Sequence, residues 1–79
     1  MYSKEIRLWF PESYARIEAE YTDNGSVILT VSELETDEEK STKDNEFLKT
    51  RTTTEIYLDV DETKELIRSL QALIPNKEV

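Results

Sequence analysis

Residues 14–34, YARIEAEYTDNGSVILTVSEL, decide the fold. Within them, Asp23-Asn24-Gly25 is a strong signal for a tight hairpin turn, because asparagine and glycine accept the backbone angles that such turns require. The run after the turn, residues 26–34, alternates its apolar side chains between two faces, as a strand does. We therefore predict an antiparallel hairpin whose turn contains Gly25.

The first half of this hairpin, residues 14–22, fits two patterns. Every second side chain from position 15 is apolar, which is typical of a strand. Tyr14, Ile17 and Tyr21 are also spaced as on a helix that Ser13 would cap. We favour the strand, because the strand after the turn needs an antiparallel partner.

Two further strands flank the hairpin. Residues 4–10 alternate apolar and polar side chains, and Pro11 ends the run while favouring an extended residue before it. Residues 50–60 alternate again, and three consecutive threonines favour a strand over a helix. These runs predict an antiparallel sheet of about four strands.

A C-terminal helix is predicted from a continuous apolar stripe: Leu66, Ile67, Leu70, Leu73 and Ile74. Asp59 or Asp61 can cap its start, and Pro75 ends it. We expect the helix to pack on the sheet face made by Ile6, Leu8, Phe10, Ala15, Ile17, Ala19, Val27, Leu29, Val31, Ile56, Leu58 and Val60. The prediction is one small α+β domain, residues 1–79, in the order β-β-β-loop-β-α.

The amino-acid composition of the chain excludes most catalytic mechanisms. The chain has no cysteine and no histidine, and its one glycine belongs to the predicted turn, which excludes thiolate nucleophiles, imidazole bases and glycine-rich phosphate loops. The sequence Asp59-x-Asp61-Glu62 resembles the start of a calcium loop, but the glycine and the closing glutamate of that loop are missing. Paired carboxylates would need a cleft that a domain of this size rarely forms. We therefore expect a protein that is not an enzyme, with no catalytic residue, metal site or cofactor.

The net charge and the hydropathy of the chain indicate which partners and which cellular location to expect. Eighteen acidic and ten basic residues give a net charge of −8, which disfavours nucleic acid and anionic membranes and favours a basic partner. No apolar run approaches the roughly 20 residues of a membrane-spanning helix, and the N-terminal residues lack the pattern of a signal peptide. We expect a cytoplasmic protein.

One sheet face is predicted to stay uncovered and to carry arginines among aromatic side chains: Arg7, Trp9, Tyr14, Arg16 and Tyr57, together with Ile28 and Arg51. Similar faces stack single-stranded nucleic-acid bases in several small domains. Glutamates 18, 20 and 55 on the same face disfavour that function. Aromatic residues and arginine are also enriched in protein–protein contacts, so the five named first are predicted to bind a partner protein.

An acidic segment follows the third strand. Residues 33–46 contain seven acids and two lysines, with Leu34 as the one apolar side chain. Such a segment buries too little to offset its loss of conformational entropy, so a long mobile loop is predicted at about residues 35–46. The loop either solubilises the domain or imitates nucleic-acid phosphate. Its candidate partner-binding residues are Glu35, Asp37, Glu38, Glu39 and Asp44.

Our first hypothesis is a protein-binding module, an inhibitor or regulator, that engages a larger basic protein such as a nuclease or another nucleic-acid-binding protein. In composition the chain resembles the small acidic inhibitors that phages and mobile elements direct against restriction or CRISPR nucleases, although no motif carries this resemblance. The alternative is a structural homodimer that associates through the open sheet face without a dedicated partner. Direct binding of single-stranded nucleic acid is a third and weaker hypothesis.

Overall fold

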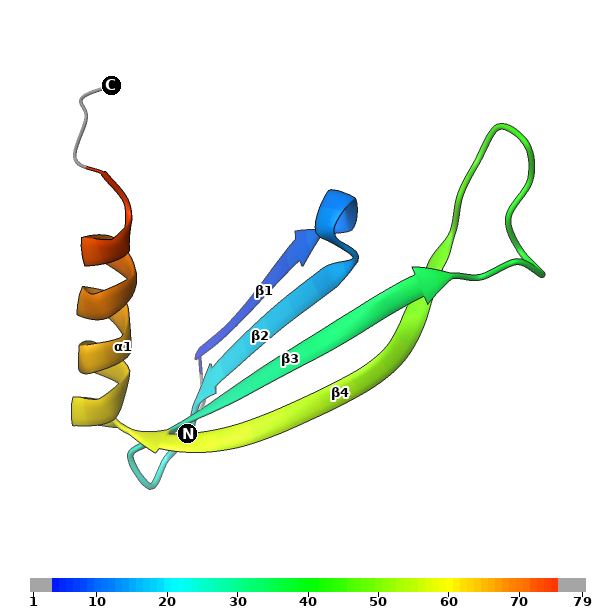
Figure 1. The fold of residues 1–79 in the computed structure, drawn as a ribbon. Coiled ribbons are helices and arrows are strands. Elements are labelled where there is room, and N and C mark those ends of the chain that lie inside the picture. The colour runs from blue at the N-terminus through cyan, green and yellow to red at the C-terminus, as the bar shows by residue number, and fades with distance from the viewer. Residues whose placement is uncertain (1–3, 76–79) are drawn as a thin grey trace.

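The computed structural model describes residues 4–75 as a four-stranded antiparallel sheet followed by one helix (Figure 1). The strands are β1 (Lys4–Phe10), β2 (Ala15–Tyr21), β3 (Ser26–Thr36) and β4 (Leu48–Asp59), and the helix is α1 (Val60–Leu73). The strands lie in the order β1-β2-β3-β4, so each one pairs with its neighbour in the sequence. The predicted α+β fold is confirmed.

A tight corner joins β1 to β2. Pro11 ends β1, as predicted, and begins a single 3-10 turn over Pro11–Ser13. Tyr14 then adopts the left-handed conformation, with φ of 52°, which is uncommon for a bulky residue. Its carbonyl accepts a hydrogen bond of 2.8 Å from the N–H of Leu34. The strand predicted after this corner is confirmed, and the helical alternative is wrong.

The predicted hairpin turn lies between β2 and β3. Gly25 has φ of +84°, a conformation that glycine adopts without steric strain. Its N–H donates to the carbonyl of Thr22 over 3.1 Å, and the N–H of Thr22 donates to the carbonyl of Ser26 over 2.9 Å. These bonds close the turn and set the register in which Tyr21 lies opposite Val27.

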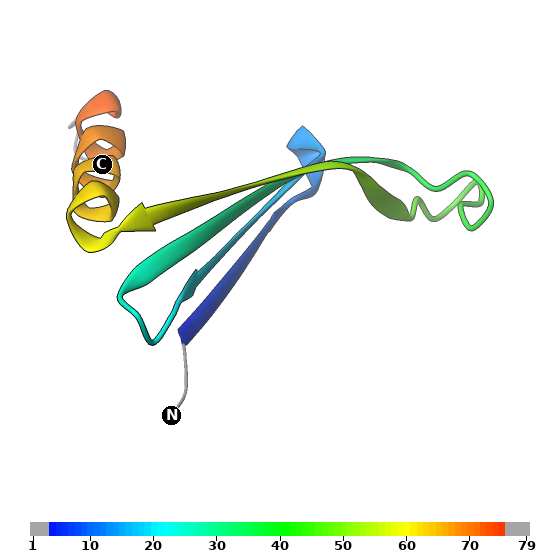
Figure 2. The same cartoon turned by 90° about the horizontal axis from the view of Figure 1, so that it is seen from below.

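The hairpin of β3 and β4 is longer than predicted. β3 continues through Thr36 and β4 begins at Leu48, so residues 35 and 36 belong to a strand and the connecting loop spans residues 37–47. Beyond residue 33, β3 pairs with β4 alone, and the register shifts between Glu33 and Leu34. We call residues 35–49 the arm, because they project past the ends of β1 and β2 (Figures 1 and 2). The mobility of its loop stays a prediction.

The start of α1 is fixed by a capping box. The Asp59 carboxylate accepts the N–H of Glu62 over 2.7 Å, and the Glu62 carboxylate accepts the N–H of Asp59 over 3.1 Å. Both bonds satisfy backbone donors that a helix terminus leaves unpaired. Of the two caps considered from the sequence, the structure selects Asp59, and Asp61 lies in the first turn.

The helix covers the predicted apolar face only at one end. α1 rises from the end of β4 and stands over that end of the sheet (Figures 1 and 2). Of its stripe, Ile67, Leu70, Leu73 and Ile74 are exposed. On the sheet, many of the predicted core residues are exposed as well: Ile6, Leu8, Phe10, Val31 and Ile56. The expected helix-on-sheet core is therefore largely open.

The residues that are buried lie elsewhere. Among residues 4–75, only Leu34 and Ser32 are almost fully shielded from solvent, at 5% and 0% exposure. Their positions two apart on β3 put them on the sheet face opposite Val31, which is the face predicted to remain uncovered. The corner at Tyr14 and the long side chain of Arg16 shield this region, through contacts that alternation of side chains along a strand does not predict.

Candidate protein-binding site

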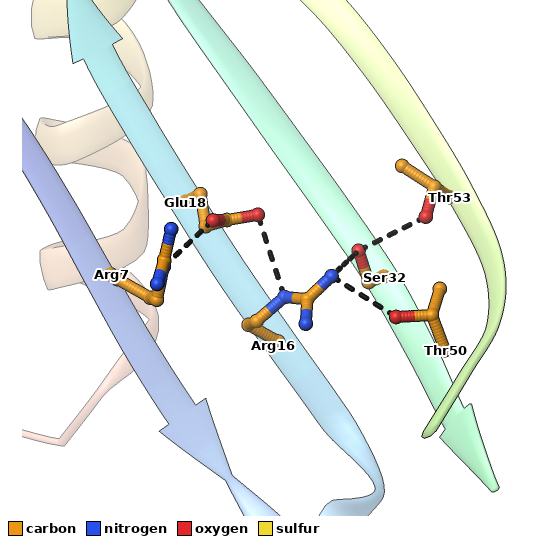
Figure 3. Close-up of polar contacts among 6 residues, drawn as sticks. All are labelled: Arg7, Arg16, Glu18, Ser32, Thr50 and Thr53. Atoms are coloured by element: carbon orange, nitrogen blue, oxygen red, sulfur yellow. Dashed lines mark hydrogen bonds and ion pairs between the residues drawn. The ribbon is translucent and has the colours of Figure 1, made fainter. Parts of the chain in front are cut away.

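We call the sheet face that carries Arg7, Trp9, Arg16, Glu18 and Ser32 the polar face. On this face, Glu18 lies between two arginines. The register of β1 and β2 places Arg7 directly opposite Glu18 and Trp9 directly opposite Arg16. The Arg7 Nε lies 2.8 Å from one carboxylate oxygen of Glu18, and the Arg16 Nε lies 3.4 Å from the other (Figure 3). One carboxylate therefore pairs with two cations on neighbouring strands.

Arg16 is the more enclosed of the two arginines. Its Nη2 donates to the hydroxyl oxygens of Ser32 and Thr50, each over 3.2 Å, and Ser32 shares a further hydrogen bond of 3.2 Å with Thr53 (Figure 3). Its Nε is buried and makes no hydrogen bond, although it is paired in charge with Glu18. The side chain thus crosses from β2 over β3 to β4 and ties three strands together.

The predicted aromatic cluster is only partly assembled. Trp9 and Tyr57 both lie on the polar face and are 52% and 65% exposed. The Arg16 Cζ lies 5.2 Å from the centre of the Trp9 ring, a cation–π contact. Tyr57 lies opposite Ile28, four residues along β4 from Thr53, and hence about 13 Å from the row that holds Trp9. The two aromatic side chains are separate contact points.

Tyr14 and Arg51 lie outside the row of Arg16, and only Arg51 is displaced from its predicted place. Tyr14 belongs to the corner before β2, and its hydroxyl donates to the Glu46 carboxylate over 3.0 Å. Arg51 falls where the β3–β4 register shifts, and its Nη1 lies 3.8 Å from the Glu33 carboxylate rather than in the row of Arg16. The bulge breaks the alternation on which the prediction for Arg51 rested.

The five acids predicted to bind a partner all lie on the arm. Glu35 lies 4.0 Å from the Lys49 ammonium group, so this pair is exposed and weak. Asp37 organises the loop, because its carboxylate accepts the N–H of Glu39 and its own N–H donates to the carbonyl of Phe47 over 2.7 Å. The others, Glu38, Glu39 and Asp44, are exposed and form no ion pair among the residues that the structure describes.

A clasp that sequence reasoning did not find holds the arm to the rest of the sheet. It consists of Tyr14, Thr36 and Glu46. The hydroxyls of Thr36 and Tyr14 both donate to the Glu46 carboxylate. The bond from Thr36 and then the bond from Tyr14 hold the pKa of Glu46 below its ordinary value. Thirty-two residues separate Tyr14 from Glu46, and no sequence pattern announces such a contact.

The sequence also did not predict a shallow acidic hollow. It lies on the polar face, and its charged lining is made of Glu5, Glu18, Glu20, Glu55 and Arg7. Four carboxylates against one guanidinium give the hollow a charge of −3. In the described part of the chain, no cluster of three or more potential ligands is arranged to hold a metal ion. The lysine or arginine side chain of a partner protein has the charge that the hollow would attract.

The chain matches no protein-family model, no curated protein and no solved structure with which it was compared. Within residues 4–75, no helix has both the length and the apolar character needed to cross a membrane.

Proposed function

We propose that this chain is a non-enzymatic protein-binding module, an inhibitor or regulator, that engages a larger basic protein such as a nuclease or another nucleic-acid-binding protein. The acidic hollow on the polar face supports this proposal most directly. Four glutamates line it, of which Glu18 is paired with Arg7 and Arg16. Trp9 follows Arg7 by two residues on the same face of β1, and its side chain is of the kind that dominates the energy of protein interfaces. A basic side chain can enter the hollow while an apolar part of the partner contacts the indole ring.

The arm supplies a second negative surface. Residues 37–47 contain five acids and two lysines, for a net charge of −3. We expect the hydrogen bonds of Asp37 and the Glu46 clasp to restrict the motion of this loop, which would limit the conformational entropy lost when a partner binds. A negative surface of this kind accelerates encounter with a basic partner and competes with phosphate for it.

The experiment is capture of a partner from host lysate by the tagged chain, followed by measured affinity for the purified partner at about 0.1 M and about 1 M salt. We expect a basic protein whose affinity falls at least tenfold at high salt and which nucleic acid displaces. A partner without excess positive charge, or binding that salt does not weaken, would contradict the proposal.

A matched pair of variants separates a specific surface from bulk charge. The first neutralises the arm by Glu38→Gln, Glu39→Gln and Asp44→Asn. The control neutralises three exposed acids elsewhere by Glu12→Gln, Asp23→Asn and Asp61→Asn, and so has the same net charge. Substitution is preferable to deleting residues 35–45, because the deletion would remove the end of β3. We expect the first variant to lose affinity more than the control, and equal losses would reduce the arm to a solubilising segment.

The alternative function, a homodimer formed through the polar face, receives less support. Two copies that meet there would bring two acidic hollows together, and repulsion between like charges opposes such contact. The same carboxylates disfavour binding of single-stranded nucleic acid.

A further inference from the structure

The chain exposes more surface than a compact monomer of its size. Its accessible surface is 6774 Å², whereas a folded monomer of 9.3 kDa exposes about 5,000 Å². Its radius of gyration is 15.9 Å, against about 12 Å for a compact domain of this length. The excess of roughly 1,800 Å² includes the projecting arm, and it is more than the roughly 800 Å² that one subunit contributes to a standard interface.

Several large apolar side chains are exposed on the sheet face that faces away from Arg16. On β1, Ile6, Leu8 and Phe10 are 57%, 47% and 42% exposed. Alternation along β1 and β2 places no acidic side chain on this face, in contrast to the polar face. It is therefore the surface on which two chains of net charge −8 can approach with least repulsion.

The apolar stripe of α1 is equally unpartnered. Leu70 is 52% exposed and Leu73 is 76% exposed, although both belong to the stripe that a globular helix normally buries. Between the helix and the sheet lies an apolar groove whose lining includes Val27, Leu58 and Leu66. The groove marks the place where an apolar layer is incomplete.

We propose that a second copy of this chain completes that layer, with α1 of each copy packed on the β1–β2 part of the partner's apolar sheet face. α1 has 14 residues and is about 21 Å long, and β1 and β2 each have seven residues and are about 23 Å long, so a helix fits along the strands. The two open surfaces are the halves of one helix-on-sheet layer. In a dimer with two-fold symmetry, α1 of each copy packs on the β1–β2 face of the other copy, so both open surfaces of each chain are covered.

The same packing explains why so little is buried within one chain. Since Ser32 and Leu34 are the fully buried residues among those described, and residues 15–20 and 25–30 are half-buried, association adds the burial that the apolar face lacks in one chain. The polar face, the hollow and the arm remain outside the interface. The dimer is thus compatible with the proposed partner binding and does not depend on it.

The first experiment is sedimentation equilibrium over a range of chain concentrations at low and high salt. We expect a dimer whose dissociation constant decreases as salt rises, because salt screens the repulsion between two acidic chains. Capture of a basic partner responds to salt in the opposite sense, so the two proposals fail separately. A monomer at all concentrations would overturn the dimer.

Adjacent helix residues supply a matched pair of variants. Leu73→Glu places a charge in the apolar stripe, and Ala72→Glu places the same charge on the opposite side of the helix. We expect the first to raise the dissociation constant at least about 100-fold and the second to change it little. Equal effects of both substitutions would contradict the proposed helix contact.

Because the first variant can unfold when the dimer is lost, a measurement on the wild-type chain locates the interface. In a sample that mixes isotope-labelled and unlabelled chains, filtered NMR detects contacts between copies only. We expect contacts from the methyl groups of Leu70 and Leu73 to those of Leu8 and Ile17. Contacts that join the Trp9 and Tyr57 faces, or two helices alone, would overturn the proposed arrangement.

Discussion

The guanidinium of Arg16 lies between the indole ring of Trp9 and the hydroxyl of Ser32, at 5.2 Å from the ring centre and 3.2 Å from the oxygen. Arg16 thereby contacts both Trp9, which is half exposed, and Ser32, which is fully buried. The planar guanidinium suits this position, because it donates hydrogen bonds within its plane and stacks with its flat face against an aromatic ring.

Replacing Arg16 by lysine is expected to lower the free energy of unfolding by about 1 kcal/mol. A single ammonium group keeps the charge but does not reproduce the two hydrogen bonds to Ser32 and Thr50 together with the stack on Trp9. Arg7→Lys is the matched control, since Arg7 is 60% exposed and, among residues 4–75, pairs with Glu18 alone. Urea unfolding at one fixed chain concentration measures both, and equal losses would contradict the bridging role of Arg16.

Trp9→Ala is expected to weaken partner binding more than folding. The indole is half exposed, and an exposed cation–π contact stabilises by about 0.5–1 kcal/mol. An aromatic anchor in an interface is commonly worth 2 kcal/mol or more, which is about 30-fold in affinity. Parallel unfolding and binding titrations compare the two losses. Global unfolding of the variant would instead identify Trp9 as a residue of the core.

The clasp of Tyr14, Thr36 and Glu46 predicts a pH dependence. Hydrogen bonds to its carboxylate lower the pKa of Glu46 in the folded chain, so they stabilise the fold fully above the ordinary value of 4.5. That contribution is lost as the pH falls through the lowered pKa. NMR titration of Glu46 should show the pKa rise more in Thr36→Val than in Tyr14→Phe, because Thr36 is the stronger cause. If neither substitution moves it, the clasp does not form in solution.

Asp59→Ala is expected to lower the free energy of unfolding by about 1 kcal/mol through loss of the capping box. Asp61→Ala is the control, because Asp61 lies in the same first turn but makes no capping bond. Far-UV circular dichroism and thermal unfolding compare the two variants. The Asp59 variant should also dimerise less tightly, since a frayed α1 presents its apolar stripe less well.

Gly25→Ala is expected to lower the free energy of unfolding by about 1 kcal/mol through backbone strain alone. An added Cβ meets no atom within 4 Å, so no steric clash contributes. Gly25→Asn should be milder, because asparagine tolerates positive φ better than alanine does. Equal losses in the two variants would point to a cause other than φ.

The strands, the hairpin turn at Gly25 and the capped helix could be predicted because each depends on residues close in sequence. The alternation of residues 26–34 and the apolar stripe of α1 directly report which side chains avoid water. The coverage of the sheet could not be predicted in this way. The spacing of apolar residues predicts that a face is covered. It does not indicate whether the chain's own helix or another chain covers it.

The binding surface was predicted less well than the fold. Arg7, Trp9 and Arg16 were correctly placed on one face, because two short strands keep a strict alternation. Arg51 was misplaced by a one-residue shift in register, and the corner over residues 11–14, which ends one residue before β2, was not predicted. The acidic hollow was missed because its glutamates were treated as obstacles to nucleic-acid binding rather than as a site.

The strand order has a consequence for how the chain folds. In a sheet ordered β1-β2-β3-β4, every pairing joins neighbours in the sequence, which gives a low contact order and favours rapid formation of each hairpin. During synthesis the sheet can pair from its first strand onward before α1 has emerged from the ribosome. In the proposed dimer, helix exchange with a second copy is a bimolecular step that follows, so its rate depends on how much of the chain a cell makes.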